Sequence, residues 1–187
     1  MHKDEKWQVY YPNGLPIADE GWDSVAGNPE DSGSDAIVGV SVVFVFRVND
    51  AGEVELLWQK RADILDRYPG DYDISAGGHI NLGESNVEGA IRECYEEIGA
   101  KITAKDLNLV TIVSFGRNRI AWIFAVDWTG REDDFKFDDG EVSEVKWVTF
   151  SKAEEFRDKY AKAPLKKDKT TLKILGNWLR AHGYLQD

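Results

Sequence analysis

The stretch GHINLGESNVEGAIRECYEEIGA (residues 78–100) joins a glycine-rich start to a segment with helical periodicity. Ser85 and Glu88 match a capping box and Gly99 stands where a C-cap glycine is expected, so we predict a helix from about Ser85 to Ile98. One stripe of this helix is apolar and should face a core. Its members are Val87, Ala90, Ile91, Cys94, Tyr95 and Ile98.

The other flank of the predicted helix carries Glu93, Glu96 and Glu97 at positions i, i+3 and i+4. Like charges at these spacings repel one another by roughly a few tenths of a kcal/mol per pair, and only Arg92 adjoins them. Mg²⁺ prefers oxygen ligands and is commonly shared between carboxylates and the phosphates of a substrate. The pattern therefore predicts a metal site for a phosphorylated substrate; for the three glutamates alone, a solvated helix face is the alternative.

The segments before the helix predict strands. Residues 37–49 are β-branched and aromatic throughout, which favours a central strand covered on both faces. A turn at 49–52 leads into a partner strand, Val54–Lys60. A short strand is predicted over 72–76, followed by a loop at Gly77-Gly78. Residues 7–18 alternate around Pro-Asn-Gly and predict a hairpin, before a flexible loop at 24–35.

After the helix, the pattern returns to strands and ends in helices. We predict strands at Leu107–Phe115, Ile120–Trp128 and Val142–Phe150, a helix from Ser151 to before Pro164, with Glu154 three residues after its start, and a last helix over 170–181. This order predicts one α/β (α+β) domain over 1–187, with a mixed sheet between helices. Residues 1–35 would form an N-terminal hairpin and loop extension, and 151–187 the C-terminal helices.

Composition limits the partners. The formal net charge is −11, with 34 acidic and 23 basic side chains, which argues against nucleic acid as the main partner. The longest apolar run, Ile37–Phe46, is far shorter than the ~20 residues that a membrane helix needs. A single cysteine, Cys94, and a start without a secretory signal lead us to expect a cytoplasmic protein with no membrane partner. A homodimer through the N-terminal hairpin is left open.

The helical stretch resembles a complete Nudix box. Its spacing is Gly78, five residues, Glu84, seven residues, Arg92-Glu93, apolar Cys94, one residue, Glu96-Glu97, one residue, Gly99 and apolar Ala100. The resemblance implies the Nudix-type α/β/α sandwich with a mixed central sheet. It also implies Mg²⁺-dependent hydrolysis, with Mn²⁺ as the other metal, of a diphosphate bond in a nucleoside-diphosphate-X compound or another small organic pyrophosphate.

The resemblance assigns roles to single residues. Glu93, Glu96 and Glu97 would bind the metal, with the Gly78 carbonyl as a further ligand and Glu84 in support. Arg92 would orient a glutamate, and Glu97, Glu93 or Glu141 would activate water. Separately from the resemblance, Lys60 and Arg61 end a strand that faces the box, so we expect them to bind the diphosphate, with surface ion pairs as the alternative.

The run LLWQKRADILDRYPGDYDISAGGHINLGES (residues 56–85) resembles the Nudix branch related to isopentenyl-diphosphate isomerase. In that enzyme a catalytic cysteine stands two residues before a histidine, where this chain has Gly77 before Gly78-His79. The missing thiol and the intact box favour hydrolysis. Glu141 matches an isomerase active-site glutamate, with Glu144 as its competitor. The counterpart of His79 binds metal there, although a loop histidine more often faces solvent.

Two other functions stay open at this point. One is an isoprenoid diphosphate isomerase, and the other is a non-catalytic diphosphate-binding or regulatory module. The box does not specify the substrate, which depends on loops such as 27–34, 62–69 and 131–140. The number of metal ions and the identity of the general base are also left open.

Overall fold

The computed structural model describes residues 5–27, 29–116, 118–131, 134–138 and 140–186. Its strands are β1 (Lys6–Tyr10), β2 (Pro16–Asp23), β3 (Ile37–Val48), β4 (Val54–Arg61), β5 (Tyr72–Asp73), β6 (Ala76–His79), β7 (Asn108–Phe115), β8 (Arg119–Asp127) and β9 (Val142–Thr149). Its helices are α1 (Asn86–Ile98), α2 (Phe150–Tyr160), α3 (Ala163–Lys167) and α4 (Thr171–Ala181), with short 3₁₀ turns η1 (Ser24–Ala26) and η2 (Pro29–Ser32).

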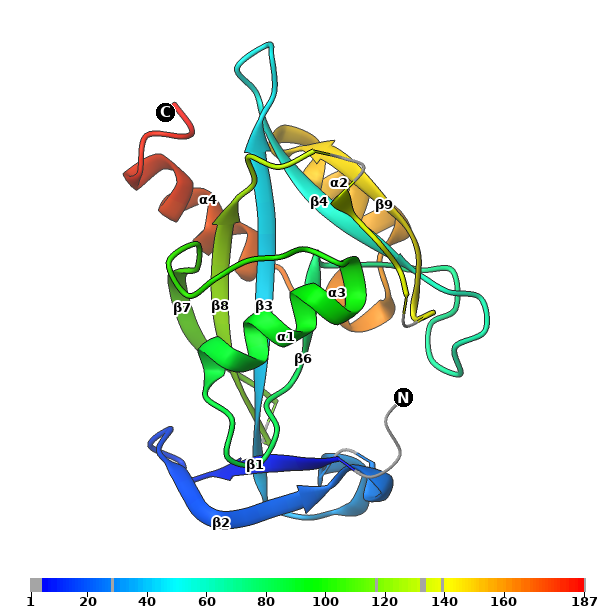
Figure 1. Cartoon of the computed structure of the whole chain (residues 1–187), viewed down its shortest axis with the longest axis vertical. Helices are drawn as coiled ribbons and strands as arrows, with labels where there is room; N and C mark the ends of the chain where they lie inside the picture. Colours follow the sequence, from blue (N-terminus) through cyan, green and yellow to red (C-terminus); the bar gives the residue numbers. More distant parts are fainter. Residues whose placement is uncertain (1–4, 28, 117, 132–133, 139, 187) are drawn as a thin grey trace.

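Strand β3 is the centre of the mixed sheet, as its continuous apolar sequence predicted. In the described part of the chain it pairs antiparallel with β1, β4 and β6 and parallel with β8. It runs the full height of the sheet in Figure 1, with the β1–β2 hairpin across its lower end. The predicted hairpin over residues 7–18 is confirmed by the antiparallel register of β1 and β2.

Two apolar cores cover the two faces of β3. Val43 and Val45 belong to the core beneath α1, whereas Phe44 and Phe46 belong to the core beneath α2 and α4. Figure 1 shows α1 in front of the sheet, with α2 and α4 behind it. The predicted α/β/α sandwich is therefore confirmed. Cys94 is fully buried beneath α1, as its position on the apolar stripe predicted.

Several local predictions need correction. The strand predicted over 72–76 is divided between β5 and β6, and the predicted Gly77-Gly78 loop is part of β6, paired with β3. Tyr95, placed on the buried stripe, is 59% exposed. Helix α2 begins one residue before Ser151, and Thr149 caps it without a side-chain hydrogen bond to the described residues. The short helix α3, which contains Pro164 in its first turn, was missed.

The predicted caps of α1 are confirmed. The Ser85 hydroxyl accepts a hydrogen bond from the Glu88 amide at 3.2 Å, and the Glu88 carboxylate accepts one from the Ser85 amide at 2.8 Å. Gly99 ends the helix in the left-handed conformation with φ 68°. The caps fix where α1 starts and stops, and so they fix which of its faces meets β6.

We expect Ser85→Ala to lower the free energy of unfolding by about 1 kcal/mol, because it removes the oxygen that satisfies a free amide of the first turn. Urea unfolding measures the change. Ser151→Ala serves as the control, since the hydrogen bond of the Ser151 hydroxyl among the described residues is a long one of 3.4 Å to the Thr149 hydroxyl. An equal loss of stability in both variants would contradict a capping role specific to Ser85.

None of the described helices is both long and apolar enough to cross a lipid bilayer.

Candidate active site

Helix α1 turns two carboxylates of the box inward. Glu93 and Glu97 lie one turn apart, so they project from the same face, and each is less than a tenth exposed. That face packs against β6, the strand that carries Gly77 and the first box glycine, Gly78. Burial of both carboxylates was not predicted, since the sequence placed the glutamates on a flank away from the core.

The backbone of Gly78 lies directly against the carboxylate of Glu93. A Cβ atom at Gly78 would lie 2.2 Å from Glu93 Oε1 and 2.7 Å from Oε2, closer than any real contact. Only glycine leaves room for Glu93 at this position. The close approach gives the first glycine of the box a physical function, and it places the peptide of Gly78 beside an acidic oxygen.

Glu97 accepts two hydrogen bonds through its Oε2 atom. The donors are the amide of Gly77 at 2.8 Å and Nε2 of Gln59 at 3.0 Å. Gln59 is a buried residue of β4 that the sequence analysis missed. Strand alternation places Gln59 on the same face as Leu57, under α1, but alternation gives no information about its distance from Glu97.

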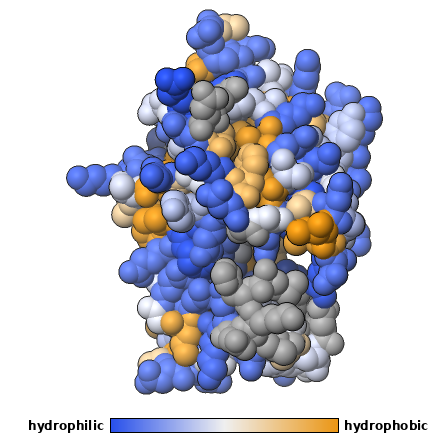
Figure 2. Space-filling view, turned by 45° about the vertical axis from the view of Figure 1, so that its right-hand side comes forward, coloured by the Kyte–Doolittle hydropathy of each residue, from blue (hydrophilic) through white to orange (hydrophobic). Residues whose placement is uncertain are grey.

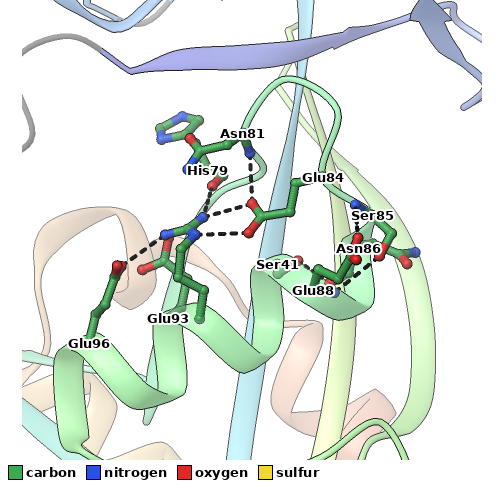
Figure 3. Close-up of polar contacts among 10 residues, drawn as sticks. Ser41, His79, Asn81, Glu84, Ser85, Asn86, Glu88, Glu93 and Glu96 are labelled. Carbon is green, nitrogen blue, oxygen red and sulfur yellow. Dashed lines mark hydrogen bonds and ion pairs between the residues drawn. The ribbon is translucent and has the colours of Figure 1, made fainter.

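The guanidinium of Arg92 donates hydrogen bonds to three glutamates and one carbonyl. Figure 3 labels these acceptors and marks the bonds with dashed lines. Nε and Nη2 donate to the two oxygens of Glu84, at 2.9 and 3.0 Å. Nη1 donates to Glu93 Oε1 at 2.8 Å and to Glu96 Oε2 at 3.0 Å. Nη2 also donates to the carbonyl of His79 at 2.8 Å. These bonds agree with the expectation that Arg92 orients a glutamate, and they extend it from one glutamate to three. Arg92 bridges all three because its fork of donors reaches several acceptors at once.

This cluster holds four box glutamates and one arginine, and burial acts on the ionisation of its inner members. Burial raises the pKa of Glu93 to about 7. Arg92 acts to lower this pKa, whereas Glu96 raises it further. Burial, followed by repulsion from Glu93, raises the pKa of Glu97 well above its usual range. Burial alone would lower the pKa of Arg92, but its bonds to Glu84 and Glu93 outweigh burial and raise it.

The donor set fits a hard divalent cation in kind. Carboxylate and carbonyl oxygens are the ligands that Mg²⁺ prefers, and an added cation would offset the repulsion between the buried Glu93 and Glu97. Among the described residues, however, no three His, Cys, Asp or Glu side chains stand in an arrangement that could already hold a metal ion. One oxygen of Glu93 and one of Glu96 instead accept hydrogen bonds from Arg92.

His79 is covered by the N-terminal hairpin. Its ring stacks on Trp7 of β1 at a centroid distance of 3.5 Å and an angle of 4°. Burial, with Arg119 and Arg92 nearby, lowers the pKa of His79 to about 3, and its Nε2 has no hydrogen-bond partner among the described residues. The expectation of a solvent-facing loop histidine is therefore wrong. The sequence offered no signal for this contact, which joins segments 72 residues apart.

Backbone bonds hold the hairpin on the loop that follows β6. The amide of Leu82 donates to the carbonyl of Lys6 at 2.7 Å, and the amide of Gly83 donates to Gln8 Oε1 at 3.1 Å. This loop leads from His79, whose carbonyl binds Arg92, to Glu84. The N-terminal hairpin thus contacts the loop after β6, and this loop in turn joins two residues that bind Arg92.

The residues predicted to contact substrate lie on different sides of the sheet. Arg61 alternates with Gln59 and shares the face beneath α1, where its Nε donates to the carbonyl of Arg67 at 3.1 Å. Lys60 projects to the opposite face, the face of the buried Trp58, because successive strand residues alternate. Strand alternation therefore places Lys60 on the face away from the box glutamates, and of the two cations Arg61 is the one on their side of the sheet.

Glu141 and Glu144, the two candidates for one active-site glutamate, have different neighbours in the structure. The carbonyl of Glu141 accepts a hydrogen bond from the amide of Ala62 at 2.8 Å, which places it beside the end of β4 that carries Arg61. The carboxylate of Glu144 instead accepts a hydrogen bond from the hydroxyl of Tyr72. Of these two competing glutamates, Glu141 is thus the one left beside Arg61.

A cavity of about 820 Å³ adjoins the exposed side of α1. Its wall includes Tyr95 and Glu96 of α1, Lys101 of the following loop, and Trp128 and Lys136. Figure 2, which brings the side of β4 and β9 forward, shows an apolar patch in the middle of this face and smaller ones near its margins, among hydrophilic residues. Of the box glutamates, Glu96 lines this cavity, whereas Glu84, Glu93 and Glu97 are not part of its wall.

We expect Gly78→Ala to destabilise the protein by about 1–3 kcal/mol, because the added methyl group forces the Glu93 carboxylate out of its place. Thermal unfolding in metal-free buffer measures the loss. Gly89→Ala on α1 is the control: its Cβ meets Glu84 and Ser41 at 3.3 Å, and alanine favours the helix. If Gly78→Ala were as stable as the wild type, the contact between Gly78 and Glu93 would not exist in solution.

Known proteins resemble this chain in sequence and in fold. Nudix hydrolase 3 of Arabidopsis thaliana is 46% identical over 48 residues, which is 26% of this chain and 6% of that protein. Isopentenyl-diphosphate Delta-isomerase of Escherichia coli is 45% identical over 49 residues, which is 26% of this chain and 27% of the isomerase. The matches thus span between 6% and 33% of the lengths of four curated relatives.

A solved structure, DR0079 from Deinococcus radiodurans, aligns with a TM-score of 0.61 at 19% identity, covering 86% of this chain and 94% of that one. At this identity the likeness supports the fold alone. The family model described as NUDIX domain matches residues 38–169, which include β3, the box and the C-terminal strands. Since this match covers well over half of the 187 residues, the chain belongs to the Nudix family.

Proposed function

We propose that this protein is a metal-dependent pyrophosphohydrolase that cleaves a diphosphate bond in a small organic pyrophosphate, such as a nucleoside diphosphate linked to another group. The observation that carries the proposal is the pair of buried carboxylates, Glu93 and Glu97, held against the glycine strand β6 with Arg92 on one side. Two desolvated acids without enough cations around them favour the binding of divalent ions and phosphates. Family membership supports the same chemistry, since Nudix hydrolases generally use divalent metal ions.

Mg²⁺, or Mn²⁺ in its place, would be held by Glu93, Glu96, Glu97 and the Gly78 carbonyl, with Glu84 in support. When bound, such an ion supplies charge neutralisation for the diphosphate and lowers the pKa of a water molecule. Arg92 holds Glu84, Glu93 and Glu96 in register by charge-assisted bonds.

Three glutamates are candidates for the general base. Glu97 is our first choice, because Gly77 and Gln59 both donate to its Oε2 atom and so fix the carboxylate, whose Oε1 atom would accept the proton from water. Glu93 and Glu141 are the alternatives, and single substitutions distinguish them. Arg61, on the same face as Gln59, would bind the diphosphate.

The isomerase alternative is disfavoured at Gly77. A Cβ atom there would lie 2.8 Å from the carbonyl oxygen of Ser41, so even the first carbon of a cysteine side chain needs a shift of β3 or β6. By the resemblance, this is the position of the isomerase's catalytic cysteine, and glycine supplies no thiol there.

The test is release of phosphate or pyrophosphate from a panel of nucleoside and isoprenoid diphosphates with Mg²⁺. We expect hydrolysis of at least one compound and its loss in a Glu96→Gln/Glu97→Gln double variant. Glu154→Gln/Glu155→Gln, an adjacent exposed pair on α2, is the control and should keep full activity. Normal turnover by the box double variant would refute the proposal.

Other outcomes identify the competing functions. A double-bond shift in isopentenyl diphosphate without phosphate release would indicate an isomerase. Tight binding of a diphosphate without turnover under any condition of pH or metal would indicate a binding module.

A further inference from the structure

A second buried ion pair lies close to the box, apart from the bonds of Arg92. Asp73 of β5 is 5% exposed, and its Oδ2 atom forms an ion pair with the ammonium of Lys162. Its Oδ1 atom accepts a hydrogen bond from the amide of Ile74 at 2.9 Å. A buried ion pair contributes little net stability, because the desolvation of both charges offsets their attraction. Stability alone therefore does not explain why this pair is kept.

The sheet register places Asp73 beside the candidate active site. Asp73 lies directly opposite Gln59 of β4, and residues opposite one another on antiparallel strands project from the same face. On that face Gln59 donates its hydrogen bond to Glu97. Burial and the charge of Glu93 raise the pKa of Glu97, and the charge of Asp73 raises it further. Asp73 thus belongs to the same charged environment as the box carboxylates.

Lys162 reaches this face from the opposite layer of the fold. It follows α2, which lies behind the sheet in Figure 1. The preceding residue, Ala161, is buried in the core beneath α2 and α4 and forms a β-bridge with Tyr72. The amide of Lys162 donates to the carbonyl of Tyr72 at 2.9 Å, and its side chain then meets Asp73 on the α1 face. The segment after α2 therefore carries a cation past β5 to the site.

The ammonium of Lys162 can bind a second anion while it stays near Asp73. An ammonium carries three donors on a flexible stem. The side chain of Lys162 is 27% exposed, whereas that of Asp73 is 7% exposed, so solvent reaches the lysine more than the aspartate. The charge of Lys162 also acts on Glu97, where it opposes the rise in pKa that burial causes. Lys162 is thus a partly accessible cation whose field extends to a box glutamate.

We propose that Lys162 is a diphosphate-binding residue of the active site, positioned by Asp73 and acting together with Arg61. This inference rests on the proposed function and deepens it, because it names a second cation for the anionic part of the substrate. Strand alternation places Lys60, predicted for this role, on the α2 face. Lys162 supplies a positive charge on the α1 face instead. Phosphate oxygens accept hydrogen bonds from its ammonium, while Asp73 keeps one donor and fixes its position.

Binding of methylenediphosphonate in the presence of Mg²⁺ tests the proposal, since this diphosphate analogue has a P–C–P bridge that water does not cleave. Isothermal titration calorimetry measures its dissociation constant. We expect Lys162→Met to raise this constant roughly 10–100-fold, the range for one hydrogen bond to a charged group. Lys169→Met is the matched control, because it removes the lysine from an ion pair with the exposed Asp158, and it should bind like the wild type.

Substitution of Asp73 separates a lysine that binds substrate from one that only neutralises a buried acid. A lysine of the second kind is dispensable once Asp73 is neutral, so the double variant Asp73→Asn/Lys162→Met would then bind like the wild type. We expect this double variant to bind as weakly as Lys162→Met, and Asp73→Asn alone to keep or tighten binding. Thermal unfolding checks that each variant is folded. The double variant also decides the question if Lys162→Met leaves Asp73 unpaired and does not fold.

The kinetics of a hydrolysed compound give a second measurement, in which we expect Lys162→Met to raise KM more than it lowers kcat. Unchanged binding and unchanged KM in a folded Lys162→Met variant, or in the double variant, would overturn the inference. Hydrolysis by the wild type would then still stand, so the proposed function would survive this result. A wild type that neither binds the analogue nor hydrolyses any compound of the panel would overturn both.

Discussion

Replacing Glu97 with glutamine is expected to lower kcat/KM for a hydrolysed diphosphate by about 10²–10⁴-fold. Glutamine keeps an oxygen that accepts the bonds from Gly77 and Gln59, so the packing of α1 on β6 is retained. The substitution removes the negative charge and the ability to take a proton from water. Steady-state kinetics with saturating Mg²⁺ measure the loss.

The same variant should be more stable than the wild type when metal is absent. Glu97 is buried close to Glu93, and burial and this repulsion raise its pKa, which shows that the ionised form is disfavoured in the fold. Glutamine relieves both effects, so we expect a gain of about 0.5–2 kcal/mol in the free energy of unfolding. Urea unfolding in EDTA measures it. Glu155→Gln, exposed on α2, should change neither activity nor stability.

The two measurements separate a functional glutamate from a structural one. A structural Glu97 would lose stability on substitution, and its loss of activity would follow from unfolding. A loss of activity together with a gain in stability is the pattern of a charge retained for chemistry. Full activity of Glu97→Gln would exclude Glu97 as general base and leave Glu93 and Glu141.

The sequence predicts α1 and the central strand well because their signals are local. The capping box needs only Ser85 and Glu88, three residues apart, and the burial of β3 follows from its unbroken apolar run. The spacing of the box also places Glu93 and Glu97 on one face. These features depend on residues within one or two helical turns or within a single strand, so contacts between distant segments are not needed to predict them.

The rest of the site depends on contacts between distant segments. Trp7 meets His79 only because β1 crosses the end of β3, and Gln59 meets Glu97 only because β4 passes beneath α1. The sequence suggested that Gly77-Gly78 forms a loop, since glycine disfavours strands. In the fold both glycines are part of β6. A side chain would clash with Glu93 at Gly78 and with β3 at Gly77.

Arg92→Lys is expected to lower kcat/KM by about 10–100-fold, the usual effect of losing a group that orients metal ligands. Lysine keeps the positive charge but has a single ammonium, which cannot bind Glu84 at both oxygens and also reach Glu93, Glu96 and the His79 carbonyl. We expect stability to fall as well, by about 1–3 kcal/mol, because partly buried carboxylates lose hydrogen bonds. Arg180→Lys, on the exposed face of α4, is the control for replacing an arginine with a lysine away from the site.

A double-mutant cycle with Glu84→Gln decides whether Arg92 acts through this network. Arg92 binds both oxygens of Glu84, so each single variant already disrupts the same pair of bonds. The double variant should therefore lose less activity than the product of the two single losses, with a coupling of about 0.5–3 kcal/mol. Additive effects would mean that Arg92 and Glu84 act separately, and Arg92 would then have to contact the substrate directly. The cycle thus distinguishes an arginine that orients ligands from one that binds phosphate, although both would lose activity as lysine.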